Sequence, residues 1–261
     1  MTPVALTIAG SDPSGGAGIQ ADLKTFHQFK VYGEAVITLL TVQITVRVSR
    51  IQCMSAQLVR EQLDAVLGDI PPHAAKTGAL GSEAVVRAVA RASSKFTFPL
   101  VVDPVMISKH GSPLLDDAAR HAMVRHLLPF ATLVTPNLPE AEALAGCPAG
   151  SLKERREAAR RIADLGPKSV LIKGGHGKGP AIDLLFHENT FIEFKAPRFK
   201  TRHTHGTGCT FSAAIAACLA RGVPLVESVA EAKGFITEAI RSNPGLGHGS
   251  GPVNHHAISV E

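Results

Sequence analysis

The sequence contains few of the aromatic side chains that stack on single-stranded nucleic acid. It has no Trp and one Tyr among 261 residues. The formal net charge is +5, but the basic residues are scattered apart from a short run at residues 153–161, where the charge spacing is typical of a solvated helix face. We therefore expect no nucleic-acid partner, and the mild basic excess suits small anionic ligands at least as well.

Long apolar runs and paired cysteines are also missing. The longest apolar stretches, such as residues 213–220, are well short of the roughly 18–20 residues that a membrane span needs. The first ten residues show no basic stretch followed by an apolar segment and a cleavage site, so we expect a cytoplasmic protein without a membrane partner. No two cysteines have C-x-x-C spacing, which predicts reduced thiols and no disulfide framework.

The remaining composition is that of a folded α/β protein. Hydrophobic residues make up 45% of the chain and charged residues 19%, which is enough for a sizeable core and excludes a disordered chain. No repeat, linker or shift in composition divides the chain, so residues 1–261 are expected to form a single domain.

Short apolar segments alternate with amphipathic ones along most of the chain. The predicted strands are residues 4–9, 35–42, 73–80, 100–105, 131–135 and 169–173. The predicted helices between them are residues 19–29, 55–67, 83–92, 116–128, 138–144 and 153–165. A β-hairpin at residues 181–196, two helices at 210–221 and 225–243, and a glycine-rich loop at 245–252 follow. This alternation predicts an α/β fold with a mainly parallel central sheet and helices on both faces.

A glycine-rich loop with the sequence GSDPSGGAG follows the first predicted strand, at residues 10–18. Glycines let the backbone approach a ligand closely, and the next helix would point its N-terminus at that ligand. Residues 16–21 match the G-x-G-x-x-[G/A] pattern of dinucleotide-binding proteins. That interpretation also needs an acidic residue at the end of the second strand, and residues 41–45 contain none. A structural tight turn is the alternative.

A second glycine segment, THGTGCT at residues 204–210, lies directly before an apolar helix. Gly206 and Gly208 would leave several N–H groups directed at one point, an arrangement that suits a phosphoryl group. Cys209 lies at the helix N-terminus, where the helix dipole is expected to lower the thiol pKa, so it could orient or deprotonate an attacking hydroxyl. The alternative is a glycine turn with a packed thiol.

Polar residues stand at the ends of three further strands or at helix starts. Asn137 and Glu140 could hold Mg²⁺ through water, or they could cap a helix together. Asp103 ends an apolar strand, where a charge needs solvent, a partner or a metal. Lys173, which is followed by Gly-Gly-His, could meet nucleotide phosphates. An anion hole, a base, a magnesium site and a lysine together indicate phosphoryl transfer.

Five segments resemble the hydroxymethylpyrimidine/phosphomethylpyrimidine kinases of thiamine biosynthesis, in the ribokinase superfamily. They are AGSDPSGGAGIQADLKTF, VVDPVM, TPNLPEAEAL, KGGH and THGTGCTFSAAIAA, and the resemblance runs from about residue 4 to 254. It implies a ribokinase-like three-layer sandwich, ATP with Mg²⁺ as cofactors, and a homodimer. It leaves open whether K⁺ is also required. It also implies two successive phosphorylations, of 4-amino-5-hydroxymethyl-2-methylpyrimidine and then of its monophosphate.

The resemblance also implies roles for single residues. The pyrimidine pocket would contain Gly10, Asp22, Gln43 and Ala79. The anion hole and the base position would be formed by Gly206, Gly208 and Cys209. The nucleotide would contact Asn137, Lys173 and Thr207. Asp103 and Glu140 would bind magnesium.

Two departures from the family pattern keep other functions open. Ile44 stands where the family has Asn, and Ala79 stands where it often has Met, which would enlarge the pocket. A pyridoxal kinase of the same superfamily is therefore the nearest alternative. A non-catalytic pyrimidine- or nucleotide-binding regulator is a second alternative, although it would have no need of Cys209. A Rossmann-type dehydrogenase ranks last.

Overall fold

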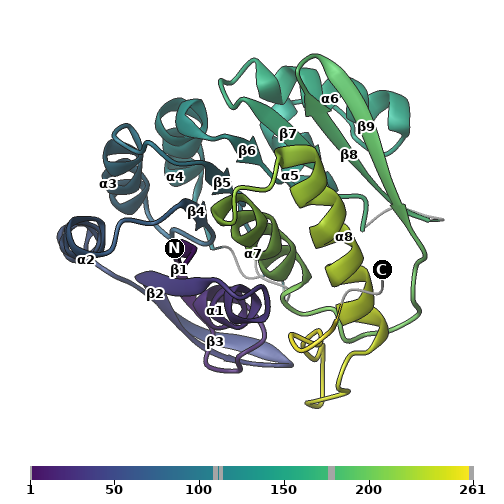
Figure 1. The fold of residues 1–261 in the computed structure, drawn as a ribbon, viewed down its shortest axis with the longest axis horizontal. Helices are drawn as coiled ribbons and strands as arrows, with labels where there is room; N and C mark the ends of the chain where they lie inside the picture. The colour runs from purple at the N-terminus through teal and green to yellow at the C-terminus, as the bar shows by residue number, and fades with distance from the viewer. Residues whose placement is uncertain (1, 108–110, 112–113, 176–179, 259–261) are drawn as a thin grey trace.

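The computed structural model describes residues 2–107, 111, 114–175 and 180–258, and their strands form one sheet (Figure 1). The strands are β1 (Val4–Ser11), β2 (Tyr32–Ile44), β3 (Arg47–Cys53), β4 (Ala74–Thr77), β5 (Leu100–Val102), β6 (Leu133–Val134), β7 (Ser169–Ile172), β8 (Ala181–His187) and β9 (Thr190–Ala196). Their order in the sheet is β3-β2-β1-β4-β5-β6-β7-β8-β9. The pairs from β2 to β7 are parallel, and β3, β8 and β9 add antiparallel edges. The predicted mainly parallel sheet is confirmed.

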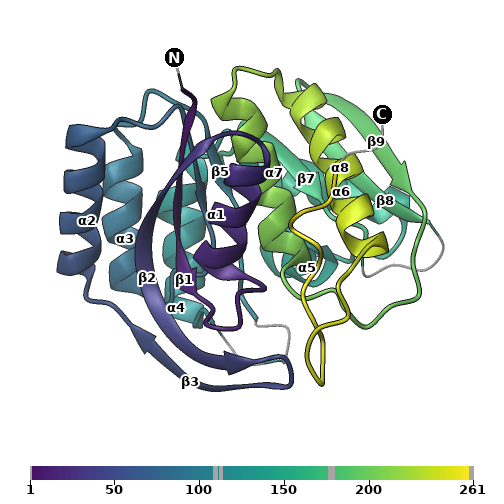
Figure 2. The ribbon, with the colours of Figure 1, turned by 60° about the horizontal axis from the view of Figure 1, so that its bottom comes forward.

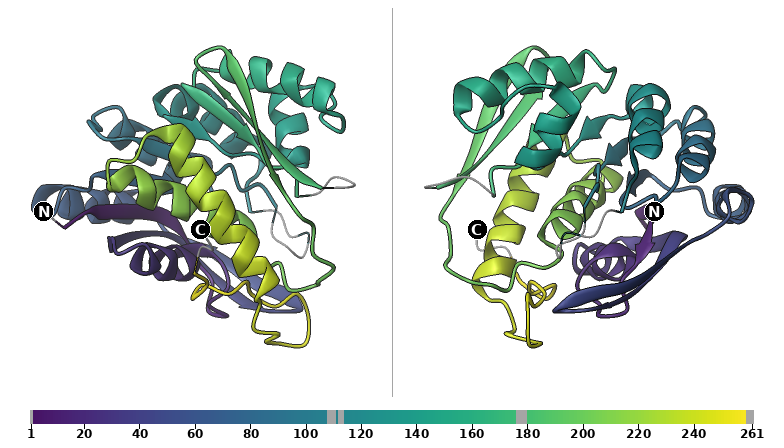
Figure 3. Two further views of the ribbon diagram at one scale, coloured as in Figure 1. Left: turned by 45° about the vertical axis from the view of Figure 1, so that its right-hand side comes forward. Right: turned by 180° about the vertical axis from the view of Figure 1, so that it is seen from behind.

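Helices cover both faces of the sheet (Figure 3). One face is covered by α1 (Gly18–Gln28), α7 (Thr207–Ala220) and α8 (Leu225–Arg241). The other is covered by α2 (Ala56–Asp69), α3 (Glu83–Ser93), α4 (Asp117–Ala122), α5 (Leu138–Ala145) and α6 (Leu152–Ala163). Side chains alternate between the faces, so Leu6 and Ile8 of β1 pack on one side and Ala5 on the other. Burial of both faces explains why the inner strands read as continuous apolar runs.

The helix predicted at residues 116–128 is interrupted. After α4, a π-helical turn at Met123–Leu127 and a 3₁₀ turn at Leu128–Phe130 continue the segment. Pro129 has no N–H to donate, so the regular hydrogen-bond pattern cannot continue through it. Ser55 caps α2, as its position predicts, by accepting a hydrogen bond from the N–H of Leu58 at 3.1 Å.

The strand β3 is absent from the sequence prediction. It pairs with β2 at the edge of the sheet, and the two form a curved ribbon beside α1 (Figure 2). Most of its side chains are exposed or half-buried, so its sequence lacks the apolar pattern that marks an inner strand. Among the helices of the described ranges, none combines the length and the apolar character that crossing a membrane requires.

The segment after α8 ties together the two glycine segments and the end of β2. The N–H groups of Gly249 and Ser250 donate to Thr45, at 3.2 and 2.9 Å, and Pro252 forms a β-bridge with His205. His255 is buried against the start of α7, where its Nε2 lies 3.1 Å from the hydroxyl oxygen of Thr210. The C-terminal segment therefore holds the loop that precedes α7.

His255 should make the stability of the folded chain depend on pH. Burial lowers the pKa of His255 to about 4, and the nearby Lys24, His256 and His205 act in the same direction. In the unfolded chain the pKa is about 6.5, so between about pH 6.5 and 4 the unfolded state binds a proton that the folded state does not bind. Stability is therefore lost as the pH falls from about 6.5 toward 4, by roughly 2–3 kcal/mol at pH 4.5. Urea unfolding of the parent and of His255→Gln at several pH values measures this loss of stability. We expect the variant to be less stable at pH 7 and the difference to shrink at low pH. Parallel curves would contradict titration of His255.

Candidate active site

A cavity of about 640 Å³ lies at the carboxyl ends of the parallel strands. This is where open parallel sheets bind ligands. Its walls include one residue from the end of each parallel strand: Gly10, Gln43, Gly78, Asp103, Asn137 and Lys173. The start of α7 closes the same cavity with Gly206, Thr207, Gly208 and Cys209. The topology thus brings nearly all of the predicted site residues together.

The two glycine segments pack directly against each other. Gly206 has a φ of 77° at the N-terminus of α7, and a Cβ on it would overlap the carbonyl oxygen of Gly16. The N–H and hydroxyl of Thr207 both donate to the carbonyl oxygen of Thr204, at 3.3 and 2.7 Å. The next two N–H groups of a helix start have no acceptor within the helix, so those of Gly208 and Cys209 can bind an anion at the cavity wall.

The prediction of a lowered pKa for Cys209 is wrong for this structure. Burial raises the pKa of the thiol to about 11, although the ammonium of Lys76 opposes the shift. The carboxylates of Asp22 and Asp103 raise it further. Desolvation and these two negative charges outweigh the helix dipole, so Cys209 holds its proton at neutral pH.

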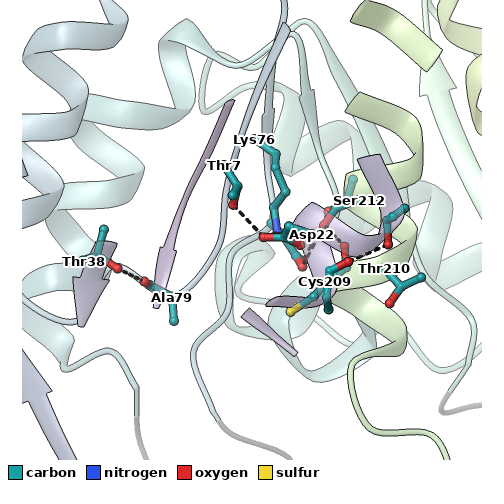
Figure 4. A network of polar contacts seen from close by, with 12 residues as sticks. Thr7, Asp22, Thr38, Lys76, Ala79, Cys209, Thr210 and Ser212 are labelled. Carbon is teal, nitrogen blue, oxygen red and sulfur yellow. Dashed lines mark hydrogen bonds and ion pairs between the residues drawn. The ribbon is translucent and has the colours of Figure 1, made fainter. Parts of the chain in front are cut away.

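Asp22 does not line the cavity, which corrects its predicted place in the pyrimidine pocket. It is fully buried, and both of its carboxylate oxygens accept hydrogen bonds from Nζ of Lys76 at 3.0 Å. The hydroxyl of Thr7 donates to it at 2.6 Å. Figure 4 shows the pair beside Cys209. Asp22 therefore lies behind the cavity wall, where it holds Lys76 and Thr7.

Lys76 was not identified from the sequence. It is fully buried in β4, and the carboxylate of Asp22 raises its pKa although burial opposes this. The signal was available, because a lysine inside the short apolar strand Ala74–Thr77 requires a buried partner.

Asp103 and Lys173 form an ion pair across the floor of the cavity. Nζ of Lys173 lies 2.7 Å from Oδ1 of Asp103, and the hydroxyl groups of Thr135 and Ser212 lie 3.3 Å from the same carboxylate. Although burial alone would lower the pKa of Lys173, the carboxylates of Asp103 and Glu140 raise it. Lys173 thus presents an ammonium group to the cavity, and a Cβ on Gly208 would lie 3.3 Å from its Nζ.

Asn137 and Glu140 cap α5 and also line the cavity, so the two interpretations of this pair are compatible. Oδ1 of Asn137 accepts from the N–H of Glu140 at 3.0 Å, and Oε2 of Glu140 accepts from the N–H of Asn137 at 2.8 Å. Burial raises the pKa of Glu140 to about 7; Asp103 adds to this shift and Lys173 opposes it.

The carboxylates of Asp103 and Glu140 fit a magnesium ion that shares its ligands with phosphates and water. Both line one cavity, and a cation between the carboxylates and a ligand would relieve the repulsion from Asp103, which adds to the effect of burial on the pKa of Glu140. Within the described ranges, no group of three His, Cys, Asp or Glu side chains could hold a metal. Mg²⁺ needs no such group, because it commonly keeps several waters and takes few protein oxygens.

The opposite end of the cavity is built from Gly10, Gln43 and Ala79. A Cβ on Gly10 would collide with the side chain of Leu39, and the carbonyl oxygen of Ala79 accepts a 2.6 Å hydrogen bond from Thr38. Gln43 is 7% exposed, and its side-chain amide lies 3.0 Å from Nε2 of His205. His205 and its partner Asp12 also line this end and were not identified from the sequence.

A further ion pair at the other end was also missed. Asp183 accepts from Nζ of Lys233 and from the N–H of Gly174, each at 2.7 Å. Arg198 donates to the carbonyl oxygens of Gly174 and Gly175. These contacts fix the segment after Lys173, whereas His176 of the same motif lies outside the described residues. An Asp within the apolar strand β8 was the available signal.

Comparison with known proteins agrees with the resemblance described for the five sequence segments. The model of the family described as "Phosphomethylpyrimidine kinase" matches residues 12–254. A hydroxymethylpyrimidine/phosphomethylpyrimidine kinase of Staphylococcus aureus (strain MRSA252) is 46% identical over 258 residues, which cover 97% of this chain and 94% of that protein. The ADP complex of Bacillus subtilis pyridoxal kinase is similar with a TM-score of 0.92 and 37% identity, covering 98% of both chains. The phosphomethylpyrimidine kinase of Clostridium difficile 630 is similar with a TM-score of 0.81 and 42% identity, covering 91% of this chain and 99% of that one.

The pair of Lys76 and Asp22 predicts a large loss of stability when one partner is removed. Lys76→Met leaves the Asp22 carboxylate buried without its cation, which we expect to lower the free energy of unfolding by about 3–5 kcal/mol. The double variant Lys76→Met/Asp22→Asn removes both charges and should recover at least half of that loss. Urea unfolding of the parent and the two variants measures the difference. A single variant within about 1 kcal/mol of the parent, or a double variant that recovers nothing, would contradict the prediction.

Proposed function

The chain belongs to the phosphomethylpyrimidine kinase family, and we propose that it uses ATP to phosphorylate 4-amino-5-hydroxymethyl-2-methylpyrimidine and then its monophosphate, in thiamine biosynthesis. Its fold is the ribokinase-like fold that its structural relatives share. The observation that carries the proposal is the single cavity in which the start of α7 faces Lys173, Asp103 and Glu140. An anion site, a cation and two carboxylates in one space are what phosphoryl transfer requires.

The two ends of the cavity suit two different ligands. Gly10, Gln43 and Ala79 are uncharged and lie at one end, where the pyrimidine ring would bind. Lys173 and Asn137 lie toward the other end, where we place the phosphates of ATP, and Thr207 at the start of α7 would also contact them. The ADP complex of the pyridoxal kinase relative supports a nucleotide as donor. Asp103 and Glu140 would hold Mg²⁺, which neutralises phosphate charge when bound.

The start of α7 lies between these ends and would bind the group being transferred. The N–H groups of Gly208 and Cys209 would stabilise its negative charge, and Gly206 allows the helix start to approach. In the step itself, the substrate hydroxyl forms a bond to phosphorus, the bond to the leaving ADP breaks, and the hydroxyl proton is released. Because this type of transfer is largely dissociative, it needs little help from a base before the transition state.

Cys209 therefore acts in this proposal first by position. A protonated thiol with a pKa of about 11 can hold the hydroxymethyl oxygen by a hydrogen bond. It becomes a proton acceptor only if ligand binding changes the charges around it. This differs from the resting thiolate that the helix dipole alone would favour.

Pyridoxal is the second candidate acceptor, and two observations favour it. The pyridoxal kinase of B. subtilis superposes on 98% of this chain with a TM-score of 0.92. Ala79 adds to this case, because a small side chain in the wall leaves room for a different ring. The family model and the 46% identical S. aureus relative favour the pyrimidine.

We also propose that residues 1–261 form one kinase domain and that two copies associate. The strand β2 supports a dimer, because its residues alternate between the cavity and an exposed apolar face. Leu39, Thr41 and Gln43 line the cavity. Leu40, Val42 and Ile44 are 44–57% exposed on the other side. A second copy that covers these side chains would remove them from water, and light scattering of the purified chain tests it.

The experiment that tests the proposed function is release of ADP from ATP·Mg²⁺ with three separate acceptors. They are hydroxymethylpyrimidine, its monophosphate and pyridoxal. Turnover with both pyrimidines would establish the two-step kinase. Turnover with pyridoxal alone would transfer the assignment to the second candidate. No turnover with any of the three would contradict both and favour a binding protein.

Cys209→Ala is expected to lower turnover at least tenfold while leaving the dissociation constant for the pyrimidine nearly unchanged. A thiol is a weak hydrogen-bond donor, so its loss changes binding little. Turnover depends on the orientation of the reacting hydroxyl, and misplacing a reacting group commonly costs tenfold or more in rate. Steady-state kinetics and calorimetric titration measure the two quantities. Cys209→Ser is the matched control, because its hydroxyl can still hold the substrate, and it should retain more turnover than Cys209→Ala. Equal turnover in the parent and Cys209→Ala would remove Cys209 from the reaction.

A further inference from the structure

Three side chains from distant segments form a hydrogen-bonded chain at the end of the cavity that contains Gly10, Gln43 and Ala79. Asp12 lies in the first glycine loop, His205 in the segment before α7, and Gln43 near the end of β2. Nε2 of His205 lies 2.7 Å from Oδ2 of Asp12 and 3.0 Å from the terminal amide group of Gln43. All three residues line the cavity, and none is more than 7% exposed.

The contacts of Asp12 determine where the hydrogen lies. Its Oδ1 accepts from the N–H and the hydroxyl of Ser14, at 2.9 and 2.7 Å, and its Oδ2 accepts from the N–H of Ala17 at 2.9 Å. Although burial opposes it, the hydrogen bonds from His205 and Ser14 hold the pKa of Asp12 below its ordinary value. An ionised carboxylate can only accept, so Nε2 of His205 carries the hydrogen that lies between them.

This hydrogen fixes the orientation of the Gln43 amide. A ring nitrogen that carries hydrogen has no lone pair in the ring plane, so it cannot accept from an NH₂ group. The amide atom of Gln43 nearest to Nε2 is therefore the carbonyl oxygen, which shares the N–H with Asp12. Nitrogen and oxygen of a side-chain amide occupy interchangeable positions, and hydrogen bonding decides between them. The NH₂ group takes the other position, where it has no hydrogen-bond partner among the described residues.

We infer that Asp12 and His205 are positioning residues that hold the Gln43 amide with its NH₂ group donating into the cavity. The inference rests on the proposed function, which supplies the ring that binds there. It makes this end of the pocket a site for heteroaromatic rings that offer a lone pair at the edge facing Gln43. The ring nitrogens of the aminopyrimidine have such lone pairs, and so do the ring nitrogen and the phenolic oxygen of pyridoxal. A ring that offers only donors at that edge is excluded.

A double-mutant cycle between His205 and Gln43 tests whether His205 acts through the amide. His205→Phe keeps a flat ring but frees the amide to rotate, and Gln43→Met removes the amide at similar volume. We expect each single variant to weaken binding of hydroxymethylpyrimidine about tenfold in calorimetric titration, as loss of one oriented hydrogen bond does. The double variant should bind no more weakly than Gln43→Met. Losses that multiply would show that His205 contributes only packing and would overturn the inference. Thermal unfolding verifies that each variant is folded.

Gln43→Glu gives a second test that does not alter His205. A glutamate has the same shape but offers only acceptor atoms, so it cannot donate to a ring lone pair. We expect it to bind the pyrimidine at least as weakly as Gln43→Met. Affinity equal to that of the parent would show that the carbonyl oxygen of Gln43 faces the ring, which contradicts the inference.

The parent chain separates failure of this inference from failure of the proposed function. Turnover of the pyrimidine by the parent together with multiplying losses in the cycle leaves the function intact and overturns the inference. If the parent binds pyridoxal and not the pyrimidine, the substrate assignment fails, and the same cycle is measured with pyridoxal. If the parent binds neither ring, the inference is overturned as well.

Discussion

A buried charge requires a partner of opposite sign, and this constraint shapes the cavity. Three lysine–aspartate pairs lie at or near its walls, with N–O distances of 2.7–3.0 Å: Lys76–Asp22, Lys173–Asp103 and Lys233–Asp183. Each pair joins two elements that are far apart in the sequence: β4 with α1, the end of β7 with the end of β5, and α8 with β8. Removing one partner of such a pair costs several kcal/mol, so the pairs fix how these elements meet. The positions of the strand ends, and therefore of the site residues, depend on them.

The same charges set the chemistry at the start of α7. Lys76 favours the thiolate of Cys209, while Asp22 and Asp103 oppose it, and burial decides the outcome in favour of the protonated thiol. Lys173 keeps its charge because two carboxylates face it. The resting site therefore offers a neutral sulfur beside an ammonium and a set of backbone N–H groups. That combination contributes to phosphoryl transfer by holding the reactants and stabilising charge, which is where most of the catalytic effect in such reactions arises.

The parts of the fold that could be predicted from the sequence are those whose burial leaves a periodic pattern. The inner strands and the helices around them were found because both faces of the sheet are covered, and the glycine segments marked the ligand-binding end. The edge strand β3 was missed because its side chains need not be apolar. The withdrawal of Asp22 from the pocket wall could not be predicted, because it depends on Lys76 lying opposite Asp22 across 54 residues of sequence. The raised pKa of Cys209 could not be predicted either, because it depends on how completely the folded chain buries the thiol. Lys76 and Asp183, in contrast, were charges inside apolar strands, and that signal could have been used.

The two ends of the cavity differ in how strictly they can select a ligand. A site that hydrogen-bonds a substrate rejects analogues without the matching group far more strongly than a pocket wall rejects a change of one methyl group. At the ring end, the matching group is a lone pair facing the NH₂ of Gln43, and both pyrimidine and pyridine rings can supply one. Discrimination between these rings then falls to the shape of the wall, in which Gly10 and Ala79 leave space. In this proposal, one backbone plan serves kinases of either ring, and the residues around a fixed donor determine which ring is preferred. This agrees with the close structural similarity of the chain to both a pyridoxal kinase and a phosphomethylpyrimidine kinase.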